Sequence, residues 1–388
     1  MKKALLVLLC MTMVVSFAFS GGQKDESSAA VKAGFIYVGP TGDYGWSYAH
    51  HESKEELEAK YPWFETVYVE SVPEGDAIRI IDRLVQEEKC NVIFTTSFGY
   101  MDDTYAAAEK YPDVKFMHCS GFKQLPNMGT YFGDLYQMYY LNGMMAGALT
   151  KTNKLGYVAA FPIPELIRHI NAFALGAKAV NPDAEVNVRW IYSWYGPDKA
   201  REAAEALITD GCDALAFTED TPAVIEVGQE HFEKGDEIYT FSHYSPMQVY
   251  GVDSVVSGQL ANWTVLYEKI ITDIYEDKWS NYDLLWLLKE DAVELGGSWD
   301  EKINPKYVDA LKAVKVDTPD MGNMSVYDLI MKRYEQMAEG REVFEPYSGP
   351  LYDNEGNLKI AEGEIAPLGD LMGIMYYVDG VVGSIPQQ

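Results

Sequence analysis

Short apolar runs alternate with longer amphipathic stretches over most of this chain, and this alternation limits the fold more than any other feature. Apolar runs rich in β-branched and aromatic residues are typical of buried strands, and strands separated by helices form βαβ units with parallel sheets. The pattern runs through one series, restarts near Lys151 to Lys154, and runs through a second. We therefore predict an α/β chain of two similar lobes. Strands are expected within 33–39, 64–72, 90–98, 114–121, 128–134, 154–161, 184–194, 212–220 and 237–244, and helices within 48–61, 75–89, 101–112, 135–152, 165–180, 198–210 and 222–234.

The C-terminal part of the chain departs from this alternation. It contains one amphipathic helical pattern, 325–340, and one hairpin pattern, 349–364. The turn of that hairpin is indicated by Asn354 to Asn357, which include a glycine.

The N-terminus has the pattern of a secretory signal. A basic start precedes an apolar run from Ala4 to Phe19, and Ser20 ends a small-residue cleavage motif. We predict a signal peptide at residues 1–20 and a flexible leader at 21–32, so the protein is expected to be exported to a periplasmic or extracellular location. A retained membrane anchor is the alternative, although the apolar run is short for a bilayer span, which takes about 20 residues.

The cysteine and histidine pattern supports neither a lipid anchor nor a metal site. Cys10 lies inside the apolar run, not at the cleavage site, so a free exported protein is favoured over a lipid-anchored one associated with the cell membrane. The remaining cysteines, Cys90, Cys119 and Cys212, have no CxxC spacing and are expected to be buried free thiols. His50 and His51 would point about 100° apart on a helix and cannot share a metal.

Charge and motif content favour binding without turnover. The formal net charge is −28, with 31 basic residues against 59 acidic ones, and such a field repels the phosphates of nucleic acid. No Walker A loop, GxGxxG, GxSxG or HExxH motif occurs, so no catalytic residue is assigned. We predict a monomeric binding protein with no cofactor and no metal.

Aromatic, hydroxyl and acidic side chains follow the expected strands, which is where ligands bind in open α/β sheets. Trp46 and Trp194 occupy such strand ends, one in each series. Aromatic residues at matching ends of two lobes favour the walls of a cleft, and packing in the core is the alternative. The candidate ligand-binding residues at these ends are Trp46, Trp194, Tyr44, Thr95, Ser97, Tyr100, Phe161, Tyr195, Glu219, Asp220 and His243.

Four stretches resemble the basic membrane protein (Bmp) family, in collinear order from about residue 33 onward. They read GDYGWSYAH, VIFTTSFGYMDDTYAAAEKYPDVKFMHCSGF, GYVAAFPIPELIRHINAFALGAKAVNP and GPLYDNEGNLKIAEGEI. The family consists of substrate-binding proteins of ABC transporters, among them purine-nucleoside receptors. The resemblance implies a type I periplasmic-binding-protein fold, in which a hinge of three strands joins two Rossmann-like lobes around a small-molecule ligand. It also implies an ABC transporter permease as partner.

With this fold, the chain is expected to cross between the lobes near residues 150–154 and 257–262. Lobe 1 is then expected at residues 33–152 plus about 260–290, and lobe 2 at 153–259 plus about 291–388, where the C-terminal segment is the least constrained part.

The resemblance also implies roles for particular residues. Trp46 takes the place of the base-stacking Phe of the family motif D-x-S-F-N, and Trp194 takes the place of the opposing Phe of S-F-x-D-P-x-K. Ala261, followed by Asn262, stands where nucleoside-binding relatives carry a Lys that serves the sugar. The chain looks most like the branch that binds free purine bases, adenine in particular.

Polar candidates divide by what they offer a purine base. Glu219 and Asp220 can accept from an exocyclic amine, and the donors are expected to be Tyr44, Thr95, Ser97 and Asn262. The alternative for the two acidic residues is that they cap the helix that begins near Pro222. The alternative functions are a purine-nucleoside or sugar binding protein, a ligand sensor and a nucleoside-processing enzyme.

Overall fold

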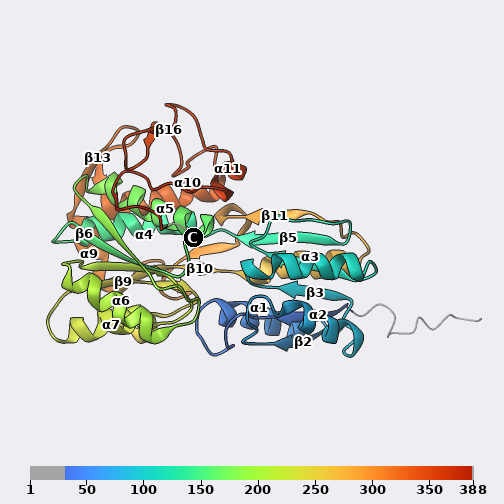
Figure 1. Ribbon diagram of the computed structural model, residues 1–388. Helices are drawn as coiled ribbons and strands as arrows, with labels where there is room; N and C mark the ends of the chain where they lie inside the picture. Colours follow the sequence, from blue (N-terminus) through green and yellow to red (C-terminus); the bar gives the residue numbers. More distant parts are fainter. Residues whose placement is uncertain (1–30, 387–388) are drawn as a thin grey trace, which may run out of the picture.

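The computed structural model describes residues 31–386. The expected signal peptide at 1–20 and most of the expected leader at 21–32 lie outside the described residues. Val31 and Lys32 already belong to the first strand, because the Val31 N–H donates to Trp63 O at 3.0 Å. Two α/β lobes lie side by side, the first mostly blue to cyan and the second green to red (Figure 1).

Lobe 1 is built on a parallel sheet whose alternating side chains feed two cores. Phe35 and Phe94 pack on one face with helices α1 (Trp46–Lys60) and α8 (Trp263–Tyr275). Ile36, the next residue along, packs on the other face with α2 (Ala77–Gln86) and α3 (Met101–Lys110), since strand side chains alternate. The strand order is β11 (Asp283–Trp286), β5 (Met128–Gly133), β4 (Lys115–Cys119), β3 (Val92–Thr95), β1 (Val31–Ile36) and β2 (Phe64–Val69).

Lobe 2 repeats this arrangement with one more strand, β17, at the edge beside β7. Its central strands are parallel, β12 pairs antiparallel with β10, and the short β17 pairs parallel with β7. The strand order is β12 (Val293–Leu295), β10 (Val255–Ala261), β9 (Tyr239–Tyr244), β8 (Ala214–Thr218), β6 (Lys154–Ala159), β7 (Glu185–Trp190) and β17 (Val381–Val382). The accompanying helices are α4 (Tyr136–Leu149), α5 (Pro164–Val180), α6 (Pro197–Thr209) and α7 (Ala223–Glu233).

The strand order reverses once in each lobe. In lobe 1 the second strand lies beside the first, and the third lies on the other side of the first, so the order changes between β1 and β3. The same reversal falls between β6 and β8 in lobe 2. Ligands of doubly wound sheets bind at such points, outside the carboxyl ends of the strands. The topology thus confirms the predicted pair of α/β lobes and fixes where a ligand site belongs.

Helix α4 packs in lobe 2, although the sequence placed it in lobe 1. It lies directly against α5, where the two backbones approach so closely that a Cβ on Gly143 would come within 2.0 Å of Phe173 O, and one on Gly176 within 1.8 Å of Tyr140 O. Almost every residue of α4 is buried. A helix that is apolar all round carries no stripe that indicates which sheet it covers.

The chain crosses between the lobes three times. Because α4 belongs to lobe 2, the first crossing lies at Asp134–Leu135, one helix earlier than the expected 150–154. The second lies at Asn262, between β10 and α8, inside the expected range 257–262. The third follows β11 at Leu287. The Asp134 N–H donates to Trp286 O at 3.0 Å, so the first and third crossings lie side by side.

The C-terminal segment covers lobe 2. Helix α10 (Val326–Glu339) contacts α4, and α11 (Leu368–Met372) contacts α5. The expected hairpin is present as β15 (Leu351–Tyr352) and β16 (Leu358–Ile360), with Gly356 of the turn at a φ of 87°. The remaining elements are α9 (Pro305–Ala313), β13 (Lys315–Thr318) and β14 (Gly322–Ser325).

One further expectation concerns the thiols. Cys90, Cys119 and Cys212 are buried and unpaired, as predicted. Among residues 31–386, none of the helices has the length and apolar character needed to cross a bilayer.

Candidate ligand-binding site

A narrow cavity lies between the two lobes at the carboxyl ends of their strands, and the centre of a water molecule can occupy about 20 Å³ of it. Lobe 1 contributes residues that follow β1, β3 and β4, and lobe 2 contributes residues that end or follow β6, β7, β8 and β9. In this closed arrangement a volume so small admits only a compact or flat ligand. Its lining residues are Val38, Trp46, Thr96, Ser97, Phe98, Ser120, Glu165, Trp194, Asp220 and Tyr244.

Trp46 forms one wall of the cavity and is fixed by its neighbours. Its indole Nε1–H donates to the backbone oxygen of Thr96, and its ring meets Trp263 edge-on at 5.1 Å and Tyr244 at 4.9 Å. The loop before it is held by the Asp43 carboxylate, which accepts the Gly45 N–H at 2.8 Å and other backbone N–H groups at the start of α1. The glycine-rich turn therefore places the indole rigidly at the strand end.

Trp194 lines the cavity from lobe 2. Its ring packs 5.2 Å from the ring of Phe161, which supports it from the side. The backbone oxygen of Trp194 accepts the Asp220 N–H at 2.8 Å. This hydrogen bond joins the loop after β7 to the loop after β8. The positions of the Trp194 indole and the Asp220 carboxyl group in the cavity are therefore linked.

The two lobes touch at the cavity, so the structure is closed. The Ser245 hydroxyl donates to the backbone oxygen of Tyr44 across the cleft, and the rings of Tyr44 and Tyr250 meet at 5.3 Å. A Cβ on Gly45 would lie 2.7 Å from Asp220 O, closer than packing allows. Gly45 therefore permits the lobes to close to this distance.

Acidic side chains dominate the electrostatics of the cavity. Asp220 is 1% exposed and neither carboxyl oxygen has a hydrogen-bond partner. Burial, followed by the neighbouring charges of Asp43 and Glu219, raises the pKa of Asp220 well above its ordinary value. Burial also raises the pKa of Glu165 to about 8, with Arg168 acting in the opposite direction. The cavity therefore holds carboxyl groups that are easily protonated.

The capping alternative for Glu219 and Asp220 is wrong. Helix α7 begins at Ala223, whose N–H bonds to the Thr221 hydroxyl oxygen at 3.3 Å, and neither acidic side chain accepts from the helix. Glu219 Oε1 instead accepts the Thr221 hydroxyl at 3.0 Å, while Oε2 has no partner. Of the two, only Asp220 lines the cavity.

The other lobe 1 candidates lie around the cavity rather than all within it. Ser97 lines it, but its hydroxyl donates to Glu74 Oε1 at 2.6 Å. Thr95 is buried in the sheet, with its Oγ1 2.8 Å from His118 Nδ1. Tyr100 is also buried, and its hydroxyl donates to a backbone oxygen. The Tyr44 side chain is 41% exposed and stacks on a neighbouring tyrosine.

The lobe 2 candidates show the same division. Phe161 packs against Trp194 and lines an adjoining hollow. The Tyr195 side chain is largely exposed, whereas His243 is fully buried and its Nδ1 lies 3.0 Å from the Tyr139 hydroxyl. Asn262, at the second crossing, donates from Nδ2 to a backbone oxygen at 3.1 Å and does not line the cavity.

Several lining residues were not among the candidates. Thr96 and Tyr244 are each one residue beyond a candidate, and because strand side chains alternate between faces, a shift of one residue decides which one faces the cavity. Ser120 and Tyr244 have φ angles of 58° and 63°, a left-handed conformation that is uncommon outside glycine. Glu165 follows β6 on the first turn of α5, and the strand-end rule could have found it.

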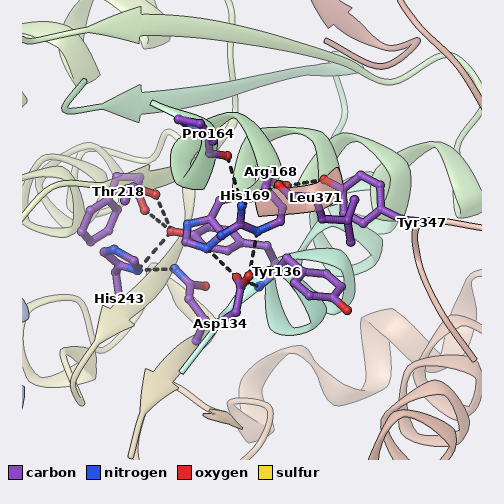
Figure 2. A network of polar contacts seen from close by, with 12 residues as sticks. Asp134, Tyr136, Pro164, Arg168, His169, Thr218, His243, Tyr347 and Leu371 are labelled. Carbon is purple, nitrogen blue, oxygen red and sulfur yellow. Dashed lines mark hydrogen bonds and ion pairs between the residues drawn. The ribbon is translucent and has the colours of Figure 1, made fainter. Parts of the chain in front are cut away.

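A buried polar network lies beside the first crossing (Figure 2). Arg168 Nε donates to Asp134 Oδ2 at 2.7 Å, and His169 Nε2 lies 3.2 Å from Asp134 Oδ1. The ring of Tyr139 stacks on His169 at 4.7 Å, and its hydroxyl reaches His243. The network connects the first crossing with α4, α5 and β9, so it links the hinge to the interior of lobe 2.

No cluster of three or more side chains that could hold a metal ion occurs within residues 31–386.

Comparison with known proteins identifies close relatives. The profile of the Bmp family, described as PnrA-like substrate-binding proteins of ABC transporters, matches residues 30–322. A purine-binding protein of Brucella abortus (strain 2308) is 34% identical over 376 residues, which cover 96% of this chain and 99% of that protein. A relative from Haloferax volcanii, named as a candidate glucose-binding protein of an ABC transporter, is 38% identical over 295 residues, or 76% of this chain and 73% of that one.

Solved structures give the fold. An ABC transporter solute-binding protein from Aeropyrum pernix K1 aligns with a TM-score of 0.67 at 16% identity, covering 80% of this chain and 92% of that one. Together with the two lobes and three crossings, this likeness identifies the type I periplasmic-binding-protein fold.

Proposed function

Because this chain belongs to the Bmp family of PnrA-like ABC transporter substrate-binding proteins, we propose that it captures a free purine base, with adenine preferred, between Trp46 and Trp194. The chain is an extracytoplasmic substrate-binding protein and not an enzyme. In the proposal it acts as a monomer that carries no lipid and delivers the base to the permease of an ABC importer.

The observation that carries the proposal is the pair of indole rings. Trp46 comes from lobe 1 and Trp194 from lobe 2, and both line the same small cavity. A purine base has two broad apolar faces, and stacking on an aromatic side chain contributes about 1–3 kcal/mol per base. Since one wall belongs to each lobe, the slot is complete only when the lobes close.

The polar lining suits a base better than a sugar. The cavity is lined by no Lys, Arg, Asn or Gln. The Thr96 hydroxyl already donates to Ile36 O at 2.9 Å, and the Ser97 hydroxyl donates to Glu74. A hexose presents hydroxyl groups all round its ring and needs donors as well as acceptors, whereas a base presents polar atoms at its edge alone.

A sugar is the second candidate, because the Haloferax volcanii relative is named as a candidate glucose-binding protein. Indole rings and carboxylates also bind pyranose rings. The relative whose name specifies purine binding nevertheless matches almost the whole of this chain, including the C-terminal segment on lobe 2. A direct comparison of ligands separates the two candidates.

Adenine is expected to bind at least about tenfold more tightly than hypoxanthine, because the two differ at one exocyclic group. The adenine amine carries two N–H donors for the carboxyl oxygens of Asp220 and Glu165. Hypoxanthine has a carbonyl there, so the carboxyl oxygens lose this donor. An acceptor left facing the carbonyl costs about 1–3 kcal/mol, and only a protonated carboxyl group that turns to donate relieves it. Adenosine is expected to bind weakly, since Ala261 stands where nucleoside-binding relatives hold the sugar.

Isothermal titration calorimetry of the purified protein with adenine, guanine, hypoxanthine, adenosine and glucose measures these differences. If adenosine bound as tightly as adenine, the proposed ligand would be a nucleoside and not a free base. If glucose alone bound, the protein would be a sugar-binding protein. If hypoxanthine and adenine bound with equal affinity, the exocyclic amine would not be the group that determines selectivity.

A further inference from the structure

Asp220 is the most unusual group in the cavity. It sits just beyond the end of β8, almost fully enclosed, with its backbone N–H held by Trp194 O. Neither carboxyl oxygen has a hydrogen-bond partner, although buried polar groups nearly always have one. Because the side chain lines the cavity, the missing partner is expected to come from the ligand.

The charges around Asp220 are all of one sign. Asp43 and Glu74 act on it from lobe 1, and Glu219 and Glu165 act on it from lobe 2. The cavity lining includes no Lys, Arg or His, and the Tyr244 phenol beside it also has a raised pKa, chiefly because it is buried. Closing the lobes on an ionised Asp220 would bury an unpaired charge among other carboxylates, which is strongly unfavourable.

We propose that Asp220 enters the closed, ligand-bound cleft as a neutral carboxylic acid, whose O–H donates to a ring nitrogen of the base while its carbonyl oxygen accepts from the exocyclic amine. This inference rests on the proposed purine function and gives Asp220 one donor and one acceptor toward the edge of the base. A carboxylate can only accept, whereas adenine presents an acceptor and a donor side by side, so the neutral acid is the complementary form.

Binding should therefore be linked to protons. In the open cleft Asp220 faces water, where an aspartic acid has a pKa near 3.9, so the carboxyl is ionised at neutral pH and takes up a proton as the lobes close. Affinity for adenine is expected to fall as pH rises above about 5, approaching a tenfold loss per pH unit until the raised pKa of the closed state is reached. A carboxylate that accepted two N–H groups would be ionised in both the open and the closed state, so the affinity would not depend on pH above about 5.

The test compares Asp220→Asn with Asp220→Ala. The amide of Asn offers one donor and one acceptor at every pH, so Asp220→Asn should bind adenine within about threefold of the unaltered protein and without a pH slope. Asp220→Ala should lose at least about tenfold, because both hydrogen bonds are absent. Calorimetry with adenine in phosphate and in Tris at the same pH gives the protons taken up, which should approach one for the unaltered protein and fall to near zero in Asp220→Asn.

Two control variants locate the proton. Glu219→Gln changes the adjacent acid, which does not line the cavity, and should leave the uptake unchanged. If Glu165→Gln abolishes the uptake while Asp220→Asn retains it, the proton belongs to Glu165 and the assignment is overturned. If Asp220→Asn loses as much affinity as Asp220→Ala, the ionised carboxylate is the form that binds the base, and the inference is also overturned.

The inference fails separately from the proposed function. An unaltered protein that binds adenine without proton uptake keeps the purine function and overturns the neutral acid. An unaltered protein that binds no purine overturns both.

Discussion

Replacing Arg168 by Met is expected to lower the free energy of unfolding by about 3–5 kcal/mol, because it leaves the buried Asp134 carboxylate without its charge partner. The side chains of Arg168 and Asp134 are 0% and 1% exposed, and the guanidinium Nε donates to the carboxylate at 2.7 Å. Burial alone would raise the pKa of Asp134, but Arg168 and His169 outweigh it and hold the pKa below its ordinary value.

Urea unfolding of the two single variants Arg168→Met and Arg189→Met measures this effect. Arg189 pairs with Asp210 at the surface, where the side chains are 46% and 51% exposed, so its loss should cost less than about 1 kcal/mol. Equal costs for the two variants would contradict the account of the network. Because the pKa of Asp134 is depressed, the contribution of the buried pair is present above the ordinary pKa of an aspartic acid and is lost as pH falls through the depressed value.

Replacing Trp194 or Trp46 by Ala is expected to weaken adenine binding about tenfold to a hundredfold, since stacking contributes about 1–3 kcal/mol for each base–ring contact. Trp194 is the cleaner test, because it sits on a loop and is only partly buried. Trp46 also packs edge-on against Trp263 and bonds to Thr96 O, so its removal should lower stability as well.

Calorimetry at a temperature where each variant is folded separates affinity from stability. Trp299→Ala is the matched control, because Trp299 is 47% exposed and does not line the cavity, so this variant should keep the affinity of the unaltered protein. Unchanged affinity in both Trp46→Ala and Trp194→Ala would contradict the proposal that the base stacks between the two indole rings.

Most of the fold follows from local pattern in the sequence. The strands from β1 to β9 and the helices from α1 to α7 fall where apolar and amphipathic stretches predicted them, because each pattern reflects which faces of an element are buried. The hairpin turn at Asn354 to Asn357 was equally readable, since Gly356 supplies its positive φ. These features depend on neighbours in the chain.

The lobe of α4 could not be read from the sequence. Its polar residues, Gln137 and Asn142, are buried like nearly all the others, so the helix has no solvent face to indicate which sheet it covers. What places it in lobe 2 is the contact of Gly143 and Gly176 with the opposing helix backbones, a relation between distant segments. The position of the first crossing depends on that packing, which is why it lies at Asp134 and not at the expected residues 150–154.

The site was predictable to the level of strand ends but not of single side chains. The rule that ligands bind at carboxyl ends located Trp46, Trp194, Ser97 and Asp220, and all four line the cavity. Within each loop, however, the choice between adjacent residues depends on which face the backbone presents. Left-handed conformations such as that of Tyr244 reverse that choice, and no signal in the sequence specifies them.

The central claim is that a free purine base fills the cavity between Trp46 and Trp194. Mass spectrometry tests it most directly, after the purified protein is incubated with equal amounts of adenine, adenosine and glucose, desalted and then denatured. The account predicts that adenine is the molecule released, and that Trp194→Ala releases much less of it. Recovery of glucose or adenosine in place of adenine would contradict the claim.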